Sequence, residues 1–242
     1  RPPPPPTPIP PTTMTPTPSN RLTNPTSSAV HDTLDGLLLA SGGALSRLPY
    51  ANATRVVLRS APPPTHVAIL SGGGSGHEPS HTGWVGDGML TCAVAGDVFA
   101  SPSVAAVRAG LAAVARAQTP HPNDPGILVV VKNYTGDRLN FALAIEQHKA
   151  EFAKPGAPPP KVAMVIVKDD AAIDPPAVGP RGLAGTVLVH KVAGAVAERG
   201  GSLEEVAAAA QAVADAVATV GVALSACSNP AAGADERGKV EA

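Results

Sequence analysis

The sequence is poor in several kinds of residue, and each shortage removes a class of protein. Only two of its 242 residues are cysteines, Cys92 and Cys227, and their separation matches neither a metal site nor a redox pair. Two buried thiols in a reducing compartment are the expected state. Aromatic residues make up 2% of the chain, so the core must be built from Ala, Val, Leu and Ile.

The sequence also lacks an excess of positive or negative charge and lacks long apolar runs. The formal net charge is −1, which gives no electrostatic footprint for nucleic acid or for a membrane surface. No uninterrupted apolar run approaches about 18 residues, the length that predicts a spanning helix. With 44% hydrophobic residues, the chain is expected to form one or two soluble domains in the cytoplasm.

Proline, by contrast, is abundant at one end. Residues 1–23 contain ten of the 28 prolines and no acidic residue. Such a segment buries too little apolar surface to offset its ordering entropy, so we expect it to be disordered or polyproline-like. Three interpretations remain open: a linker, a ligand for proline-binding modules and a transit peptide. Because Met is not the first residue, we also expect the chain to begin inside a longer product.

From Asn24 onward, apolar strand-like runs alternate with helical patterns. The pattern predicts strands at Val67–Leu70, Ile127–Val131, Val162–Val167 and Val222–Ala226. It predicts helices from Asn24 to about Ser41 and at Val104–Ala117, Phe141–Phe152, Leu183–Glu198 and Leu203–Val220. Ser202 with Glu205 forms a capping box for the last helix. This alternation is typical of an α/β fold: a mostly parallel sheet with helices on both faces.

A glycine-rich segment follows the first predicted strand. Ser71–Ser80 reads SGGGSGHEPS, and its glycines are expected to turn the backbone sharply and present N–H groups to a ligand. The spacing fits neither a dinucleotide fingerprint nor a P-loop, because the sixth position from Gly72 is His77 and no lysine is near. A small polar molecule handled by hydrogen bonds and proton transfer is the better match.

A second polar segment follows the next predicted strand. Lys132–Asn140 begins KNYTGD, with Asp137 as a candidate proton acceptor and Lys132 as a donor to an oxygen. The alternative is a solvated turn in which Asp137 caps the helix that follows. Since ligands of open parallel sheets bind at the carboxyl ends of strands, both segments are expected to share one site.

Three further groups have plainer interpretations. His81 lies four residues after His77, but Pro79 between them argues against a helical metal pair, so His81 is interpreted as structural. His190 and Lys191 are interpreted as packing or surface residues. Asp169, Asp170 and Asp174 are interpreted as a solvated loop, with a divalent-cation site as the less favoured alternative.

The sequence reads SGGGSGHEPSHTGWVGDGMLTCAVAGDVFASPS at 71–103, VKNYTGDRLNFALA at 131–144 and RGLAGTVLVHKVAGAVAERG at 181–200. In this order and spacing, the three segments resemble the dihydroxyacetone-binding half of dihydroxyacetone (glycerone) kinases. The resemblance extends from about Asn24 to Gly233. It implies a substrate-binding α/β domain at 24–180 and the start of a second, truncated α/β subdomain at 181–242.

The resemblance also implies roles for individual residues. Positions matching Gly74, His77, Ser101, Lys132 and Asp137 surround the substrate in that family, and those matching His77 and Asp137 assist phosphoryl transfer as acid and base. No metal ligand is implied in this chain. The implied substrate is dihydroxyacetone or a related short sugar.

Two parts of the family's machinery are not found in the sequence. The histidine that holds the ketone covalently lies in an HGEPG-type segment, and ATP and Mg²⁺ are held by a separate helical domain or subunit. We therefore expect this chain to bind neither cofactor and to show no turnover alone. We expect it to bind the sugar with a dissociation constant no lower than millimolar, a binding free energy of about 4 kcal/mol. A homodimer is implied by the family only. The alternative function is a non-catalytic ketose sensor or regulator.

Overall fold

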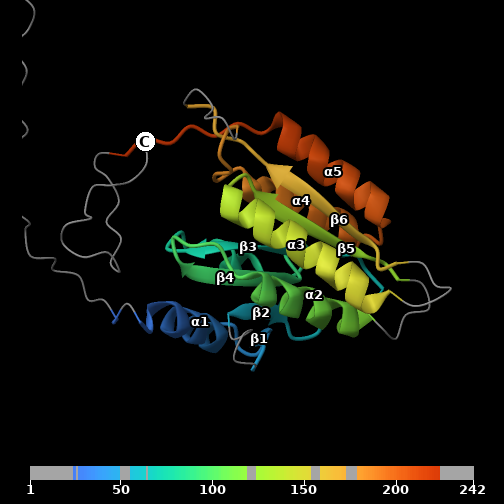
Figure 1. Ribbon diagram of the computed structural model, residues 1–242, viewed down its shortest axis with the longest axis horizontal. Coiled ribbons are helices and arrows are strands. Elements are labelled where there is room, and N and C mark those ends of the chain that lie inside the picture. The colour runs from blue at the N-terminus through green and yellow to red at the C-terminus, as the bar shows by residue number, and fades with distance from the viewer. Residues whose placement is uncertain are drawn as a thin grey trace, which may run out of the picture.

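Six strands form one sheet in the order β1-β2-β4-β3-β5-β6 (Figure 1). The computed structural model describes residues 24–25, 27–49, 55–63, 65–118, 124–153, 159–172 and 179–223. The strands are β1 (Leu45–Arg47), β2 (Val56–Arg59), β3 (Ala68–Ser75), β4 (Cys92–Val98), β5 (Ile127–Lys132) and β6 (Val162–Val167). The helices are α1 (Ala29–Ala40), α2 (Val104–Gln118), α3 (Thr135–Phe152), α4 (Thr186–Glu198) and α5 (Leu203–Ala216), with a 3₁₀ turn at Thr82–Trp84.

The predicted α/β class is confirmed. Strands β4, β3, β5 and β6 run parallel, whereas β1 and β2 are antiparallel additions at one edge. Along β3, Ile69 faces a core shared with α4 and α5, and Leu70 faces a second core shared with α2 and α3. A central parallel strand is buried on both faces, which explains its continuous apolar run. Helices therefore cover both faces of one sheet (Figure 1).

Several strand predictions need correction. Strands β1, β2 and β4 were not predicted: the first two are very short, and Gly96 and Asp97 interrupt the apolar pattern of β4. The strand predicted at Val222–Ala226 is wrong in its described part. Val222 is 92% exposed and lies outside any strand, and residues 224–226 lie outside the described part of the chain.

The ends of the helices show which local signals are reliable. Ser202 accepts a hydrogen bond from the backbone of Glu205, whose side chain accepts one from the backbone of Ser202, so the predicted capping box is confirmed. The helix ends at Ala216, earlier than predicted, because the backbone of Thr219 donates to Asp169 and pairs with the segment after β6. At the other end of the chain, α1 begins after Ser28, which makes no side-chain cap to the backbone.

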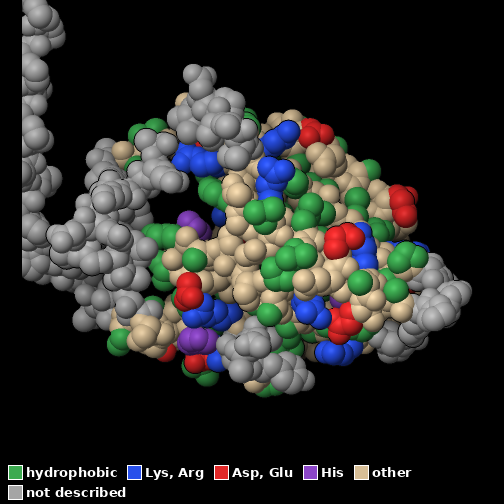
Figure 2. All heavy atoms as spheres, in the orientation of Figure 1, with side chains coloured by type: hydrophobic (Ala, Val, Ile, Leu, Met, Phe, Trp, Pro, Cys, Tyr) green, Lys and Arg blue, Asp and Glu red, His purple; other side chains and the backbone are tan. Residues whose placement is uncertain are grey.

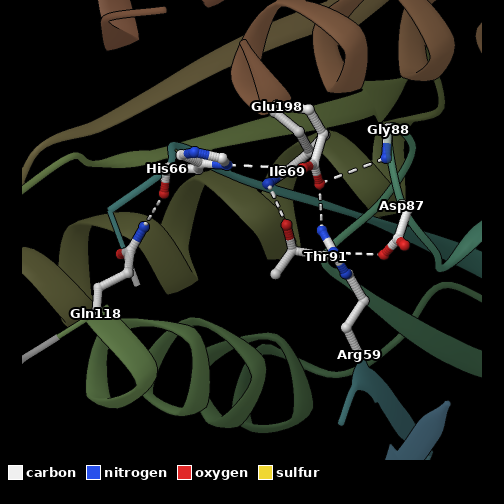
Figure 3. A network of polar contacts seen from close by, with 8 residues as sticks. All are labelled: Arg59, His66, Ile69, Asp87, Gly88, Thr91, Gln118 and Glu198. Carbon is white, nitrogen blue, oxygen red and sulfur yellow. Dashed lines mark hydrogen bonds and ion pairs between the residues drawn. The ribbon is translucent and has the colours of Figure 1, made fainter. Parts of the chain in front are cut away.

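A network of hydrogen bonds and ion pairs connects the end of α4 to the end of the sheet at which β3 begins (Figure 3). Arg59 at the end of β2 donates to Glu198 at the end of α4 and to Asp87. Glu198 also accepts from the backbone of Gly88, and His66 lies 3.6 Å from its carboxylate. Because Arg59 is only 12% exposed, these charge-assisted bonds help to fix α4 across the sheet.

Figure 2 shows acidic, basic and hydrophobic side chains interspersed over the face in view, without a continuous patch of one charge. No described helix is long and apolar enough to cross a membrane. The predictions for residues 1–23, Cys227 and Asp174 fall outside the described residues.

Candidate functional site at the carboxyl ends of the parallel strands

The two polar segments singled out in the sequence leave the same edge of the sheet. Strands β3 and β5 are parallel neighbours, with Ser71 opposite Val130. The segments that follow them therefore emerge side by side, as the rule for parallel sheets requires. A third segment, Phe99–Ser101, joins them at this edge because β4 pairs with β3 in the same direction.

The glycine run does not turn as predicted. Gly72, Gly73 and Gly74 continue β3 to Ser75, and the left-handed backbone begins at Gly76, with φ of +99°. The run instead allows close approach: a Cβ on Gly74 would stand 2.8 Å from the backbone nitrogen of Ala100. The glycines thus bring the segment after β4 against the end of β3.

That close approach places Ser101 beside the start of α3. A Cβ added to Gly136 would stand 2.6 Å from the Ser101 hydroxyl, so glycine leaves room for it there. The Ser101 side chain hydrogen-bonds to Asp137 and thereby lowers the pKa of that carboxyl. Gly74, Ser101 and Asp137 are therefore connected through consecutive contacts.

Asp137 lies in the first turn of α3, which begins at Thr135, six residues earlier than predicted. It does not cap the helix: the N-cap is Tyr134, with no side-chain cap. The Asp137 side chain is buried and its Oδ1 has no protein partner among the described residues. Burial raises the pKa of Asp137, and Ser101 and the charge of Lys132 oppose that rise. A carboxyl in this state is suited to accept a proton.

Lys132 is the last residue of β5, and 8% of it is exposed. Burial lowers its pKa, while the carboxylates of Asp137 and Asp169 act in the opposite direction. Its Nζ lies 5.5 Å from the centroid of the Tyr134 ring, within the range of a cation–π contact. A cation is therefore held against the strand end, beside the candidate base.

His77 follows the left-handed turn at Gly76 and stacks at an angle on Phe99, with the ring centroids 5.3 Å apart. Burial lowers the pKa of His77, the charge of Lys132 lowers it further, and Glu78 opposes both. The structure thus brings together the five predicted residues, which we call the strand-end cluster: Gly74, His77, Ser101, Lys132 and Asp137.

Two histidines that the sequence did not assign to the site lie against this cluster. His81 and His190 are 4% and 0% exposed, with ring centroids 5.6 Å apart. Burial, followed by the charge of Lys132, lowers the pKa of His190 to about 3. His190 packs in the core, as one of its two interpretations had it. Its nearness to the cluster had no sequence signal, because 109 positions separate it from His81.

The acidic cluster after β6 is not a solvated loop in its described part, because Asp169 and Asp170 are buried. Asp169 is buried and accepts hydrogen bonds from the backbone of Leu183 and Gly185 and from the Thr219 hydroxyl. Asp170 accepts from Arg181 at 2.9 Å. Asp169 therefore satisfies N–H groups at the start of α4. Among the described residues, no three His, Cys, Asp or Glu side chains gather as metal ligands.

A cavity of about 560 Å³ opens beside Ser101. It is lined by residues from α1, β4, α2 and α3, including Gly96, Asp97 and Asn140, and by Arg55, which precedes β2. Of the strand-end cluster, only Ser101 lines it, so the cavity and the cluster share one side chain.

These features define an α/β domain with a cluster of polar side chains at the carboxyl edge of a parallel sheet. Comparison with known proteins assigns the family. Residues 35–241 match the model of the Dak1 domain, so the chain belongs to the Dak1 domain family.

The similar proteins include kinases and a kinase subunit. The chain is 49% identical over 217 residues to the mouse protein named triokinase/FMN cyclase, covering 88% of this chain and 35% of that one. It is 41% identical over 215 residues to the dihydroxyacetone-binding subunit DhaK of a PTS-dependent dihydroxyacetone kinase from Listeria innocua, covering 88% of this chain and 60% of that one.

Solved structures show the same fold. The dihydroxyacetone kinase of Citrobacter freundii, in complex with AMP-PNP and Mg²⁺, superposes with a TM-score of 0.71 and 46% identity, over 81% of this chain and 34% of that one. A dihydroxyacetone kinase operon co-activator superposes with a TM-score of 0.64 and 32% identity, over 75% of this chain and 51% of that one. The chain spans about a third of the length of the first curated relatives it matches.

Proposed function

We propose that this chain is the substrate-binding part of an ATP-dependent dihydroxyacetone kinase. The intact protein would transfer the γ-phosphoryl group of ATP to a hydroxyl of dihydroxyacetone or a related short sugar. The observation that carries the proposal is the buried carboxyl of Asp137, with Lys132 and Ser101 beside it, at the edge of the sheet where ligands bind. The names of the relatives agree with this chemistry.

The four members of the strand-end cluster that have side chains each have a part in that reaction. A hydroxyl that attacks a phosphoryl group needs accurate placement and a nearby proton acceptor more than covalent help. Asp137 takes the proton from the hydroxyl. Lys132 and Ser101 stabilise its carboxylate beforehand, and His77, held on Phe99, hydrogen-bonds the sugar.

ATP and Mg²⁺ are expected to bind outside the described residues. No described group of acidic, histidine or cysteine side chains is suited to hold a metal ion, so no step of the reaction is assigned to one here. The Citrobacter freundii kinase, whose structure contains AMP-PNP and Mg²⁺, is more than twice as long as this chain. A helical ATP-binding domain or subunit is therefore the proposed partner, with a homodimer and a cytoplasmic location as further expectations.

The proposal is tested on the intact protein that contains this chain. ATP-dependent phosphorylation of dihydroxyacetone is measured for the parent and for Asp137→Asn. We expect kcat to fall about 10²- to 10⁴-fold, the usual contribution of a positioned acid or base. Asp215→Asn, on the exposed face of α5, is the matched control. Full turnover by Asp137→Asn would exclude the proposed role.

A regulatory function is the second candidate, because one structural relative is named as an operon co-activator. A regulator needs the pocket but no proton acceptor. Saturable binding of dihydroxyacetone by the intact protein, with no ATP-dependent turnover, would favour it over the kinase.

A further inference from the structure

His81 is buried between β3, β5 and α4, and its two ring nitrogens have different surroundings. Nδ1 lies 3.3 Å from the hydroxyl oxygen of Ser71. Nε2 has no protein partner among the described residues. Since a neutral imidazole has one donor and one acceptor nitrogen, the neighbour of Nδ1 decides which nitrogen carries the proton.

The hydrogen bond of Ser71 places the imidazole proton of His81 on Nδ1. The Ser71 hydroxyl donates its single hydrogen to the carbonyl oxygen of Val130, at 2.7 Å. Its oxygen is then available only as an acceptor, so Nδ1 of His81 must donate to it. Burial, aided by His190, Lys132 and His77, lowers the pKa of His81 well below 6.5 and keeps the ring neutral. Nε2 therefore carries a lone pair.

Nε2 of His81 and the carboxyl group of Asp137 both lie close to Gly73. A Cβ built on Gly73 would stand 3.1 Å from Nε2 of His81 and 3.8 Å from Oδ2 of Asp137. Because residue 73 is glycine, no side chain occupies that position. The other carboxyl oxygen of Asp137, Oδ1, has no protein partner among the described residues.

We propose that His81 is a positioning residue whose Nε2 lone pair accepts a hydrogen bond from the carboxyl group of Asp137 once that group is protonated. The role within catalysis rests on the proposed function. The proton leaves the attacking hydroxyl of the sugar, bonds to the carboxylate of Asp137 and stays there. The imidazole gains a hydrogen bond and no charge. A hydrogen bond to the neutral form stabilises the neutral form, so His81 helps Asp137 to hold its proton.

The surroundings are compatible with this assignment. Lys132 from β5, His190 from α4 and His77 face His81, and the cationic form of each opposes protonation of the ring. Ser101 and Lys132 face Asp137 and favour its ionised form. The proposed hydrogen bond to His81 favours the protonated form of Asp137. The neighbours of Asp137 therefore act on its pKa in opposite directions.

The tautomer and the contact are tested by NMR on the chain labelled with ¹⁵N-histidine. We expect His81 at about pH 7 to carry its proton on Nδ1, the less stable tautomer of free histidine. As the pH falls through the pKa of Asp137, the Nε2 resonance should shift as a hydrogen-bonded acceptor without becoming protonated. His148, also buried with an unpartnered Nε2, is the internal control, and its Nε2 resonance should not follow the titration of Asp137.

Variants make the NMR result decisive. In Asp137→Ala the pH response of Nε2 should disappear, and in Ser71→Ala the Nδ1–H tautomer should lose its preference. A proton found on Nε2 in the parent, or an Nε2 resonance that ignores the titration of Asp137, overturns the proposal. Neither result depends on kinase activity.

Kinetics of the intact protein give a separate readout. His81→Leu removes the acceptor and should lower kcat for phosphorylation about tenfold with little change in KM. His81→Gln, whose amide oxygen can accept at the position of Nε2, should restore most of the loss. Equal losses in both variants contradict the positioning role. An inactive parent refutes the proposed function and leaves the NMR test of His81 intact.

Discussion

Lys132 and Asp137 offset each other's cost of burial. Burial lowers the pKa of Lys132 and raises that of Asp137, so each group is pushed toward its neutral form. The charge of each partner acts against that push. Lys132 ends β5 and Asp137 lies in the first turn of α3. The fold therefore places a carboxyl group whose pKa depends on Lys132 where the strand ends.

Replacing Lys132 tests this coupling. In Lys132→Met the cation is lost, and the pKa of Asp137 should rise further because nothing opposes burial except Ser101. A base must be ionised to act, so the acid limb of the pH profile of kcat/KM should move to higher pH in the intact protein. Lys149→Met, in the last turn of α3 and ion-paired with Glu146, is the control. An unmoved acid limb in Lys132→Met would contradict the coupling.

Replacing Gly74 tests whether the glycine run serves close approach. In Gly74→Ala the new Cβ meets the backbone of Ala100 at 2.8 Å, so the segment that carries Ser101 must shift. Overpacking of this kind costs about 1–3 kcal/mol of unfolding free energy, measured by urea denaturation. Gly86→Ala is the matched control, because no atom lies within 4 Å of its added Cβ. A Gly74→Ala variant as stable as the parent would contradict the close approach of the Ala100 segment to the end of β3.

The central strands and helices were predictable because local signals agree with their tertiary positions. Strand β5 matches its predicted range to within one residue, since all of its residues are buried and its two faces lie in the two apolar cores. The antiparallel edge was not predictable. Strand β1 has three residues, and its pairing with β2 depends on long-range contacts that no local pattern reveals.

The features of the site also divide into those that the sequence predicts and those that depend on tertiary packing. His77, Lys132 and Asp137 follow strands directly, so the rule for parallel sheets places them together. Three features lay beyond that rule. The strand conformation of Gly72–Gly74 depends on pairing with β4, the burial of Asp169 depends on Thr219, and the nearness of His190 to His81 depends on how α4 packs.

Asp169 is expected to be a stability residue and not a metal ligand. In Asp169→Asn the side chain loses one acceptor and the charge that strengthens its bonds to Leu183 and Gly185. We expect a loss of about 1.5–3 kcal/mol of unfolding free energy. Asp215→Asn, on the surface of α5, should change it by less than about 0.5 kcal/mol. Stability of the parent that rises with added Mg²⁺, and does so only while Asp169 is present, would speak for a cation site instead.

His190 should make the chain sensitive to acid. Its pKa is about 3 in the folded protein against an ordinary value of 6.5, so the unfolded chain binds a proton in this window that the folded chain does not. The stability that neutral His190 contributes is therefore complete above about pH 6.5 and is lost as the pH falls toward 3, by up to about 1.4 kcal/mol per pH unit. In His190→Leu, urea denaturation between about pH 7 and pH 5 should show a smaller decline than in the parent. His81 and His148 remain in the variant, and burial lowers their pKa values too, so the decline should be reduced and not abolished. An identical decline in both proteins would mean that His190 is protonated in the folded state as readily as in the unfolded one.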